Sequence, residues 1–306
     1  MTEPKKGVLA IITCCSVWGL SAIYYKALSH VPPLEVLSHR TLWSFVFFGL
    51  VLLLQRRLAL VPTLIRKHFA VVLAAAVAIS TNWFLFILSV QIGRATEASL
   101  GYYIFPLVAV LLGRFVLGEQ LSRVKWLAVG MAAVAVVLLT WGLGIAPWIS
   151  LALAITFGFY GLFKKSMAAG PVVSVAAEVT ILLPLALVWL YGAHVAGWQG
   201  VTGRAGGFFG GNLSDTLLLI GAGPLTAVPL MLFSYGSRRV TLSTVGLVQY
   251  LNPTLQFAVA VFVFSESFTL WHAIAFAIIW TALAIYSFDA LTADRRVQAK
   301  RARSNS

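Results

Sequence analysis

Several ionisable residues lie inside long apolar stretches of this 306-residue sequence, where burying a charge in lipid is costly. Glu178 has no basic residue within four positions of it, and His39 occurs in another stretch beside Arg40. An imidazole titrates near neutral pH, and burial and nearby cations act in opposite directions on a carboxyl group. We therefore predict proton coupling at Glu178, His39 and Glu97. The alternative for Glu178 is a structural hydrogen bond.

Arg40 needs a partner because it lies roughly two helical turns inside its stretch. The candidates are Glu178, Glu97 and an anionic substrate. Glu35 lies one turn before His39 on the same helical face, where the two side chains would form a pair near the membrane surface.

Polar side chains follow helical spacing in several other stretches. Gln249, Asn252 and Gln256 share one helical face, and so do Asn82 and Ser89. We predict a substrate-binding site lined by Arg40, Asn82, Trp83, Tyr102, Tyr103, Gln249, Tyr250 and Asn252. The alternative for such faces is hydrogen bonding between helices, and for the aromatic residues it is core packing.

The elements that must position these residues are membrane helices. Hydrophobic residues make up 60% of the chain and charged residues only 10%, a balance unlike that of soluble domains. Several apolar runs reach the ~20 residues that a spanning helix requires. The sequence therefore predicts an all-α membrane protein with ten transmembrane helices, at 7–27, 34–54, 69–91, 95–117, 124–142, 148–167, 172–192, 216–236, 241–264 and 270–288.

The distribution of positive charge predicts the orientation. The net charge is +13, and basic residues gather in alternate loops and in the C-terminal tail. With the N-terminus in the cytoplasm, the outer loops and helix ends carry only Lys26, Arg94 and Arg204, as the positive-inside rule requires. We expect both termini in the cytoplasm, a flexible glycine-rich outer loop at 193–215, and a disordered basic tail.

An internal repeat divides the chain. Tyr103, Pro106 and Glu119 recur 147 positions later as Tyr250, Pro253 and Glu266. The recurrence suggests matched proline kinks, and glutamates at span ends that either pair with loop cations or cap helices. We predict two five-helix halves, residues 1–145 and 146–290, followed by a tail at 291–306. Because five is odd, the second half would be inverted in the membrane, a symmetry typical of transporters with a central site.

The chain resembles RarD-type proteins of the EamA branch of the drug/metabolite transporter (DMT) superfamily over nearly its whole length. The resemblance is carried by Val17-Trp-Gly19, His39-Arg40-x-x-Trp43-Ser44, Asn82-Trp83-x-Leu-Phe86, Glu97-Ala-Ser-Leu-Gly-Tyr102, Gly118-Glu119, Phe157-Gly-Phe-Tyr-Gly161, Pro224-Leu-Thr-Ala-Val-Pro229 and Gln249-Tyr250-x-x-Pro253-Thr254. The resemblance implies inverted repeats, a central cavity, and export or exchange of small metabolites across a bacterial inner membrane. One departure is Phe105, where the family tends to have asparagine; the repeat counterpart Asn252 is kept.

Several function classes lack support. The sequence contains no nucleotide-binding loop, zinc motif or nucleophile motif, so we expect neither an enzyme nor a cofactor. The leading hypothesis is a secondary-active transporter that works by alternating access, with proton coupling. The alternatives are a facilitative carrier without proton coupling and a membrane scaffold or sensor. The expected partners are a small-molecule substrate and the lipid bilayer, with no nucleic acid; a homodimer remains open.

Overall fold

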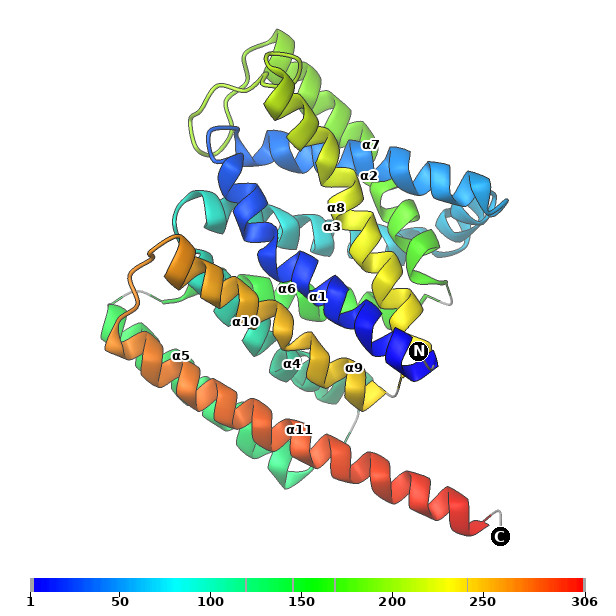
Figure 1. Ribbon diagram of the computed structural model, residues 1–306, viewed down its shortest axis with the longest axis vertical. Helices are drawn as coiled ribbons and strands as arrows, with labels where there is room; N and C mark the ends of the chain where they lie inside the picture. The colour runs from blue at the N-terminus through cyan, green and yellow to red at the C-terminus, as the bar shows by residue number, and fades with distance from the viewer. Residues whose placement is uncertain (1–2, 119, 145, 168, 241, 305–306) are drawn as a thin grey trace.

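The computed structural model describes residues 3–304 apart from 119, 145, 168 and 241, and the side chains apart from those of 242–243 and 290–304 (Figure 1). Its helices are α1 (Glu3–Ala27), α2 (Pro33–Leu54), α3 (Leu60–Gln91), α4 (Ala95–Leu117), α5 (Arg123–Leu143), α6 (Trp148–Lys165), α7 (Pro171–Val195), α8 (Leu213–Ser237), α9 (Leu242–Gln249), α10 (Leu251–Ala258), η1 (Val259–Val263) and α11 (Leu270–Ser304).

Nine membrane-spanning candidates occur among the described residues, one of them made of α9, α10 and η1, and α6 is the tenth apolar segment. This confirms the prediction of an all-α membrane protein of about ten helices. Large apolar side chains such as Phe115, Trp141 and Phe262 are exposed on the outside of the bundle, as a surface in contact with lipid requires.

The helix ends follow local chemistry. Proline begins both α2 and α7, at Pro33 and Pro171, where its missing N–H costs nothing. Gly118 and Gly144 end α4 and α5 in the left-handed conformation, with φ of 69° and 68°. The side chain of Asn212 accepts a hydrogen bond from the N–H of Asp215 and caps α8.

The two repeated prolines act differently. Before Pro253, the ninth span is interrupted at Tyr250, because Pro253 has no N–H for the carbonyl of Gln249. Pro106 instead lies within the continuous helix α4. The two prolines therefore differ in whether the helix assignment is interrupted near them.

Two other segments differ from the sequence expectations. Helix α3 begins at Leu60, but a kink with non-helical backbone at His68 (φ −133°, ψ 36°) separates its first part from the part that starts at residue 69, where the span was predicted. Helix α11 continues to Ser304, so the backbone of the basic tail is helical rather than disordered. Apolar length defines where a span must be, but it does not define where a helix stops outside the lipid.

Helices from the two ends of the sequence interleave. Helix α1 packs against α8 and α10, while α6 packs against α3 and α4; α2 contacts α8, while α7 contacts α3. Helices α2 and α7 pair directly, as do α4 and α10, and α5 lies beside α11 along one edge (Figure 1). The contacts correspond in pairs if α1 is exchanged for α6, α2 for α7, and α3 for α8. For example, the contact of α1 with α8 corresponds to that of α6 with α3.

Two glycines allow close approach at one such pair of contacts. A Cβ atom on Gly19 in α1 would lie 2.6 Å from the Cβ of Leu255 in α10. A Cβ on Gly158 in α6 would lie 3.0 Å from a methyl group of Leu112 in α4. Small residues let helix backbones approach closely in membranes, so these positions set the spacing of α1 and α6 from their partners.

Candidate functional site

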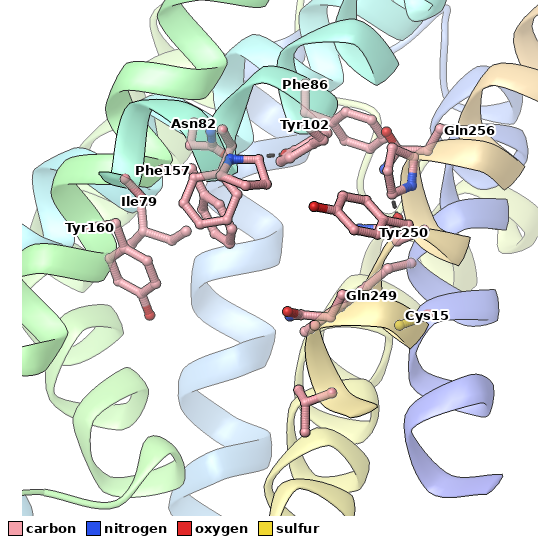
Figure 2. Close-up of a pocket in the computed structure, with 18 of the residues that line it drawn as sticks. Cys15, Ile79, Asn82, Phe86, Tyr102, Phe157, Tyr160, Gln249, Tyr250 and Gln256 are labelled. Carbon is pink, nitrogen blue, oxygen red and sulfur yellow. Dashed lines mark hydrogen bonds between the residues drawn. The ribbon is translucent and has the colours of Figure 1, made fainter. Parts of the chain in front are cut away.

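A cavity of about 600 Å³ lies inside the helix bundle. Seven of the eight residues predicted to bind substrate line it: Arg40, Asn82, Trp83, Tyr102, Gln249, Tyr250 and Asn252. In Figure 2, Asn82, Tyr102 and Phe157 lie on one side of the space, and Gln249 and Tyr250 lie on the other. The cavity is therefore enclosed by helices from both halves of the sequence.

Arg40 is the buried charge of this cavity. Its side chain is 8% exposed. Its Nε donates to Oγ1 of Thr226 at 2.9 Å, and its Nη1 donates to the hydroxyl of Tyr25 at 2.8 Å. The guanidinium lies 4.0 Å from the ring centroid of Trp83, a cation–π contact.

The carboxylate partners considered for Arg40 are not its partners in this structure. Among the described residues, Arg40 forms no ion pair; Glu97 is paired with Arg94, and Glu178 is paired with Lys164. The guanidinium is instead held by hydroxyl groups and aromatic rings, which leave its charge uncompensated.

Asn82 uses its hydrogen-bonding capacity within the protein. Its Nδ2 donates to the carbonyl of Leu153 at 3.0 Å and to Oγ1 of Thr156 at 3.1 Å, while its Oδ1 accepts from the hydroxyl of Tyr102 at 2.9 Å. Asn82 thus connects α3 to α6 and orients Tyr102 at the cavity wall. This matches the interhelical alternative for the polar face better than direct substrate binding.

On the polar face of the ninth span, some side-chain atoms have no hydrogen-bond partner within the described residues. Gln256 donates from Nε2 to Oδ1 of Asn252 at 3.0 Å, and its own Oε1 is buried without a partner. The Gln249 side chain forms no hydrogen bond within the described part of the chain, although it lines the cavity. These two amides retain polar atoms for an occupant.

Tyr103 is the predicted binding residue that the structure places elsewhere. Its hydroxyl shares a 2.6 Å hydrogen bond with Oγ1 of Thr254, and its ring packs edge-on against Phe276 and Trp280 of α11. Tyr102 and Tyr103 are neighbours on a helix and diverge by about 100°. Only Tyr102 reaches the cavity.

Glu178 lies behind the cavity wall. It is fully buried, and its Oε1 is 2.5 Å from the ammonium of Lys164. Its Oε2 accepts a hydrogen bond from Tyr160 at 3.2 Å, and Tyr160 lines the cavity. Arg40 does not contact Glu178, which was one of its three candidate partners, and His39 does not contact Glu178 either. The carboxylate is connected to the cavity through one tyrosine.

The other two residues predicted to carry protons lie outside the cavity lining. The His39 ring stacks on Phe209 at 4.8 Å between centroids, and both of its nitrogens are buried without a hydrogen-bond partner. Glu97 is bound by Arg94 at 2.5 Å near the start of α4. The three residues named for proton coupling are thus not brought together.

At one end of the bundle, two carboxylates accept hydrogen bonds from backbone N–H groups of other segments and so hold the helix ends together. Glu266 accepts hydrogen bonds at its two oxygens from the N–H of Ala95 and of Thr96, at 2.7 and 2.8 Å. Glu35 is fully buried and accepts from the N–H of Gly207 and of Phe208, at 2.9 and 2.8 Å. Glu266 therefore caps α4, as its position at a span end suggested, whereas its repeat counterpart Glu119 lies outside the described residues.

The glycine-rich segment between α7 and α8 is packed rather than flexible. Arg204 donates to the carbonyl of Ser29 and, at 2.8 Å, to Oε1 of Gln91. Phe208 lies edge-on against His30 at 5.3 Å. The expectation of a loosely attached loop is wrong, because Glu35 and the aromatic pairs hold this segment over the ends of α2 and α3.

The opposite end is lined by residues at helix ends. The cavity reaches Lys125 at the start of α5, Val245 in α9 and Tyr286 in α11. Among the described lining residues, Arg40 and Lys125 are the charged ones, and neither Asp nor Glu occurs. No cluster of potential metal ligands is found in the described part of the chain.

Sequence reasoning missed the partners of the charged groups. In the sequence, Lys164 is only a basic residue at the end of an apolar stretch, and Tyr25 and Thr226 carry no signal beyond their residue types. Thr226 is 186 positions from Arg40 in the chain. Only the packing of α1, α2 and α8 brings Tyr25, Arg40 and Thr226 together.

Comparison with known proteins defines the family. Residues 5–141 match the model of the EamA-like transporter family. The chain is 39% identical to an uncharacterized transporter of Vibrio cholerae over 306 residues, covering 98% of this chain and 97% of that protein. It is 38% identical to Protein RarD of Escherichia coli K12, covering 96% and 98%.

The chain belongs to the EamA-like transporter family, as a RarD-type protein. The family resemblance predicted from the motifs is confirmed. A solved crystal structure is similar to this fold with a TM-score of 0.55 and 18% identity, covering 91% of this chain and 96% of the other. Membership of the EamA-like family makes this a multi-pass membrane protein with a transporter role.

Proposed function

We propose that this EamA-like protein is a secondary-active carrier that exports or exchanges a small metabolite by alternating access. The observation that carries the proposal is a cavity lined by both halves of the chain, whose lining reaches helix ends at Lys125 and Tyr286 and does not include Glu35 or Glu266 at the other end of the bundle. A carrier that binds its substrate between two halves needs such an arrangement.

Inverted halves, at residues 1–145 and 146–290, support the alternating motion. Contacts between the halves come in exchangeable pairs, and Gly19 and Gly158 occupy corresponding close contacts. In such a fold the second state follows when the two halves exchange their packing. The closure formed by Glu35 and Glu266 would then open, and the end lined by Lys125 would close.

The direction follows from the charge bias. With both termini in the cytoplasm of a bacterial cell, the closed end of the bundle lies outside and the cavity opens inward. Positive charge in the loops and helix ends on the open side of the bundle, including Arg56, Arg66 and Lys164, favours that orientation. This state of the carrier would accept a cytoplasmic metabolite, which suits export or exchange.

Proton coupling is assigned here to Glu178. It is buried, paired with Lys164, and connected to the cavity by Tyr160. Movement of Tyr160 with the substrate would change the environment of the ion pair, and a buried pair responds by proton exchange when one partner is displaced. The alternative is a facilitative carrier in which Glu178 and Lys164 only hold α6 against α7.

The test of the carrier function compares metabolites in cells and medium for two variants. Ala109 lines the cavity, so Ala109→Trp would fill part of it. Ala133 is exposed on α5, so Ala133→Trp adds the same bulk facing outward. We expect the variant with the filled cavity, and not the control, to change the distribution of a small metabolite at equal membrane abundance. Identical profiles for both variants and the parent would contradict the proposal.

A further inference from the structure

We propose that the cavity selects small organic anions with a planar apolar body, and that Arg40 holds the acidic group. This inference rests on the proposed carrier function and names the substrate class of the same site. The first support is charge. The cavity is lined by two cations, Arg40 and Lys125, and by no carboxylate among the described residues. A cationic substrate would meet repulsion in this space without a compensating group.

The second support is the free side of the Arg40 guanidinium. Nε and Nη1 are held by Thr226 and Tyr25, and Cζ lies 4.0 Å from the ring centroid of Trp83. Nη2 forms no hydrogen bond within the described residues, in a side chain that lines the cavity. A guanidinium fixed in this way presents a preformed donor group, and Arg binds oxyanions such as carboxylate and phosphonate through such groups.

The third support is the missing counter-charge. A buried cation without an anion is costly, and hydroxyl groups and cation–π contacts compensate it only in part. If Arg40 only connected α1, α2 and α8, neutral side chains would do so without that cost. An anion entering the cavity would supply the missing charge, and would gain more there than in water because the surroundings are apolar.

The aromatic walls define the rest of the occupant. Trp83, Phe86, Tyr102, Phe157 and Tyr250 surround the space beside Arg40. Their rings offer faces and edges on which a planar group packs. At about 600 Å³ the cavity admits a molecule of drug-like size. Lys125, at the end that reaches the surface, adds a positive charge along the entry path.

The experiment measures binding of matched probes to the purified protein in detergent. The probes are benzoate and phenylphosphonate as anions, benzamide as an uncharged analogue, and benzylammonium as a cation. We expect the anions to raise the Tm and the other two probes to leave it unchanged. The two anions distinguish a carboxylate-specific site from one that also takes phosphonates. If neither anion binds more tightly than benzamide, including the case in which no probe binds, the proposal is wrong.

Variants locate the effect. Arg40→Met should weaken anion binding by about tenfold or more, the loss expected for a hydrogen bond to a charged group, and leave benzamide unchanged. Lys26→Met removes the same charge outside the cavity lining and should leave anion binding as in the parent. Anion preference that survives in Arg40→Met would overturn the proposal. If Arg40→Met does not fold, Arg40→Lys keeps the charge but loses the planar group, and should weaken anion binding.

Transport is tested separately from this preference. Proteoliposomes loaded with unlabelled benzoate are measured for uptake of labelled benzoate. Anion binding without exchange would keep the inference and contradict the carrier function. Exchange of benzamide with the same efficiency as benzoate would support a carrier and contradict the inference.

Discussion

The Glu266 carboxylate receives both the backbone N–H and the hydroxyl of Thr96, each at 2.8 Å, across 170 residues of sequence. The donors lie at the start of α4, where helix N–H groups have no partner within the helix and the helix dipole favours a negative charge. This contact joins the end of the ninth span to the start of the fourth. It closes the bundle at the end opposite Lys125.

Weakening this closure should favour the opposite state of the carrier. In Glu266→Gln, the charge is lost and one oxygen acceptor becomes a donor. We expect a cysteine placed at Ala98, which is fully buried near this end, to react about tenfold faster with an impermeant maleimide, in a background without Cys14 and Cys15. Glu3→Gln, which alters an exposed ion pair, is the control. Equal labelling rates in both variants would show that Glu266 does not hold the closure.

The Glu178–Lys164 pair should behave as a unit. Glu178→Gln leaves Lys164 without its counter-charge and should destabilise the protein by about 3 kcal/mol, seen as a lower Tm and lower abundance. Glu178→Gln combined with Lys164→Met should recover most of that loss. The double variant then tests coupling in liposomes with a pH gradient. Proton-driven accumulation that persists in the double variant would show that the pair is structural.

Two cavity amides should respond differently to truncation. Asn82→Ala removes the three hydrogen bonds of a buried side chain, so we expect a fall in abundance that accounts for any loss of transport. Gln249→Ala removes a side chain with no hydrogen bond in the described structure, so abundance should stay normal while transport falls. Both are measured by quantitative immunoblot beside a transport assay. A parallel fall of abundance and transport in Gln249→Ala would mark that residue as packing.

The close helix contact at Gly19 should be sensitive to a single methyl group. Gly19→Ala places a Cβ 2.6 Å from the Cβ of Leu255, so α1 and α10 must separate, at a cost of about 1–3 kcal/mol. Gly49→Ala in α2 meets no atom within 4 Å and gains helix propensity, so its Tm should stay level or rise. If both variants lose the same stability, the close approach is not what Gly19 provides.

Labelling in intact cells tests the orientation. Gly206 is unsuitable for a cysteine, because its Cβ would lie 2.9 Å from the carboxylate of Glu35. Val201 in the same segment is 68% exposed and should react with an impermeant maleimide once Cys14 and Cys15 are replaced. A cysteine at Arg57 should react only after the membrane is opened. Reversed labelling of the two sites would invert the proposed orientation.

Much of the fold follows from the sequence because a helix in lipid must satisfy its own backbone. Each span is therefore defined by local apolar length, and the predicted segments match the helices within a few residues at most ends, with α3 and α11 as exceptions. Helical spacing likewise placed Arg40, Gln249 and Asn252 toward one cavity. These properties depend on residues that are near one another in the chain.

Only the tertiary structure decided which charges meet. Lys164 rather than Arg40 pairs with Glu178, and Tyr103 faces α11 while its neighbour Tyr102 faces the cavity. The sequence is compatible with several basic partners for each carboxylate. The choice among them is set by the positions of separate helices, and those positions depend on contacts between residues up to 186 places apart, such as Arg40 and Thr226.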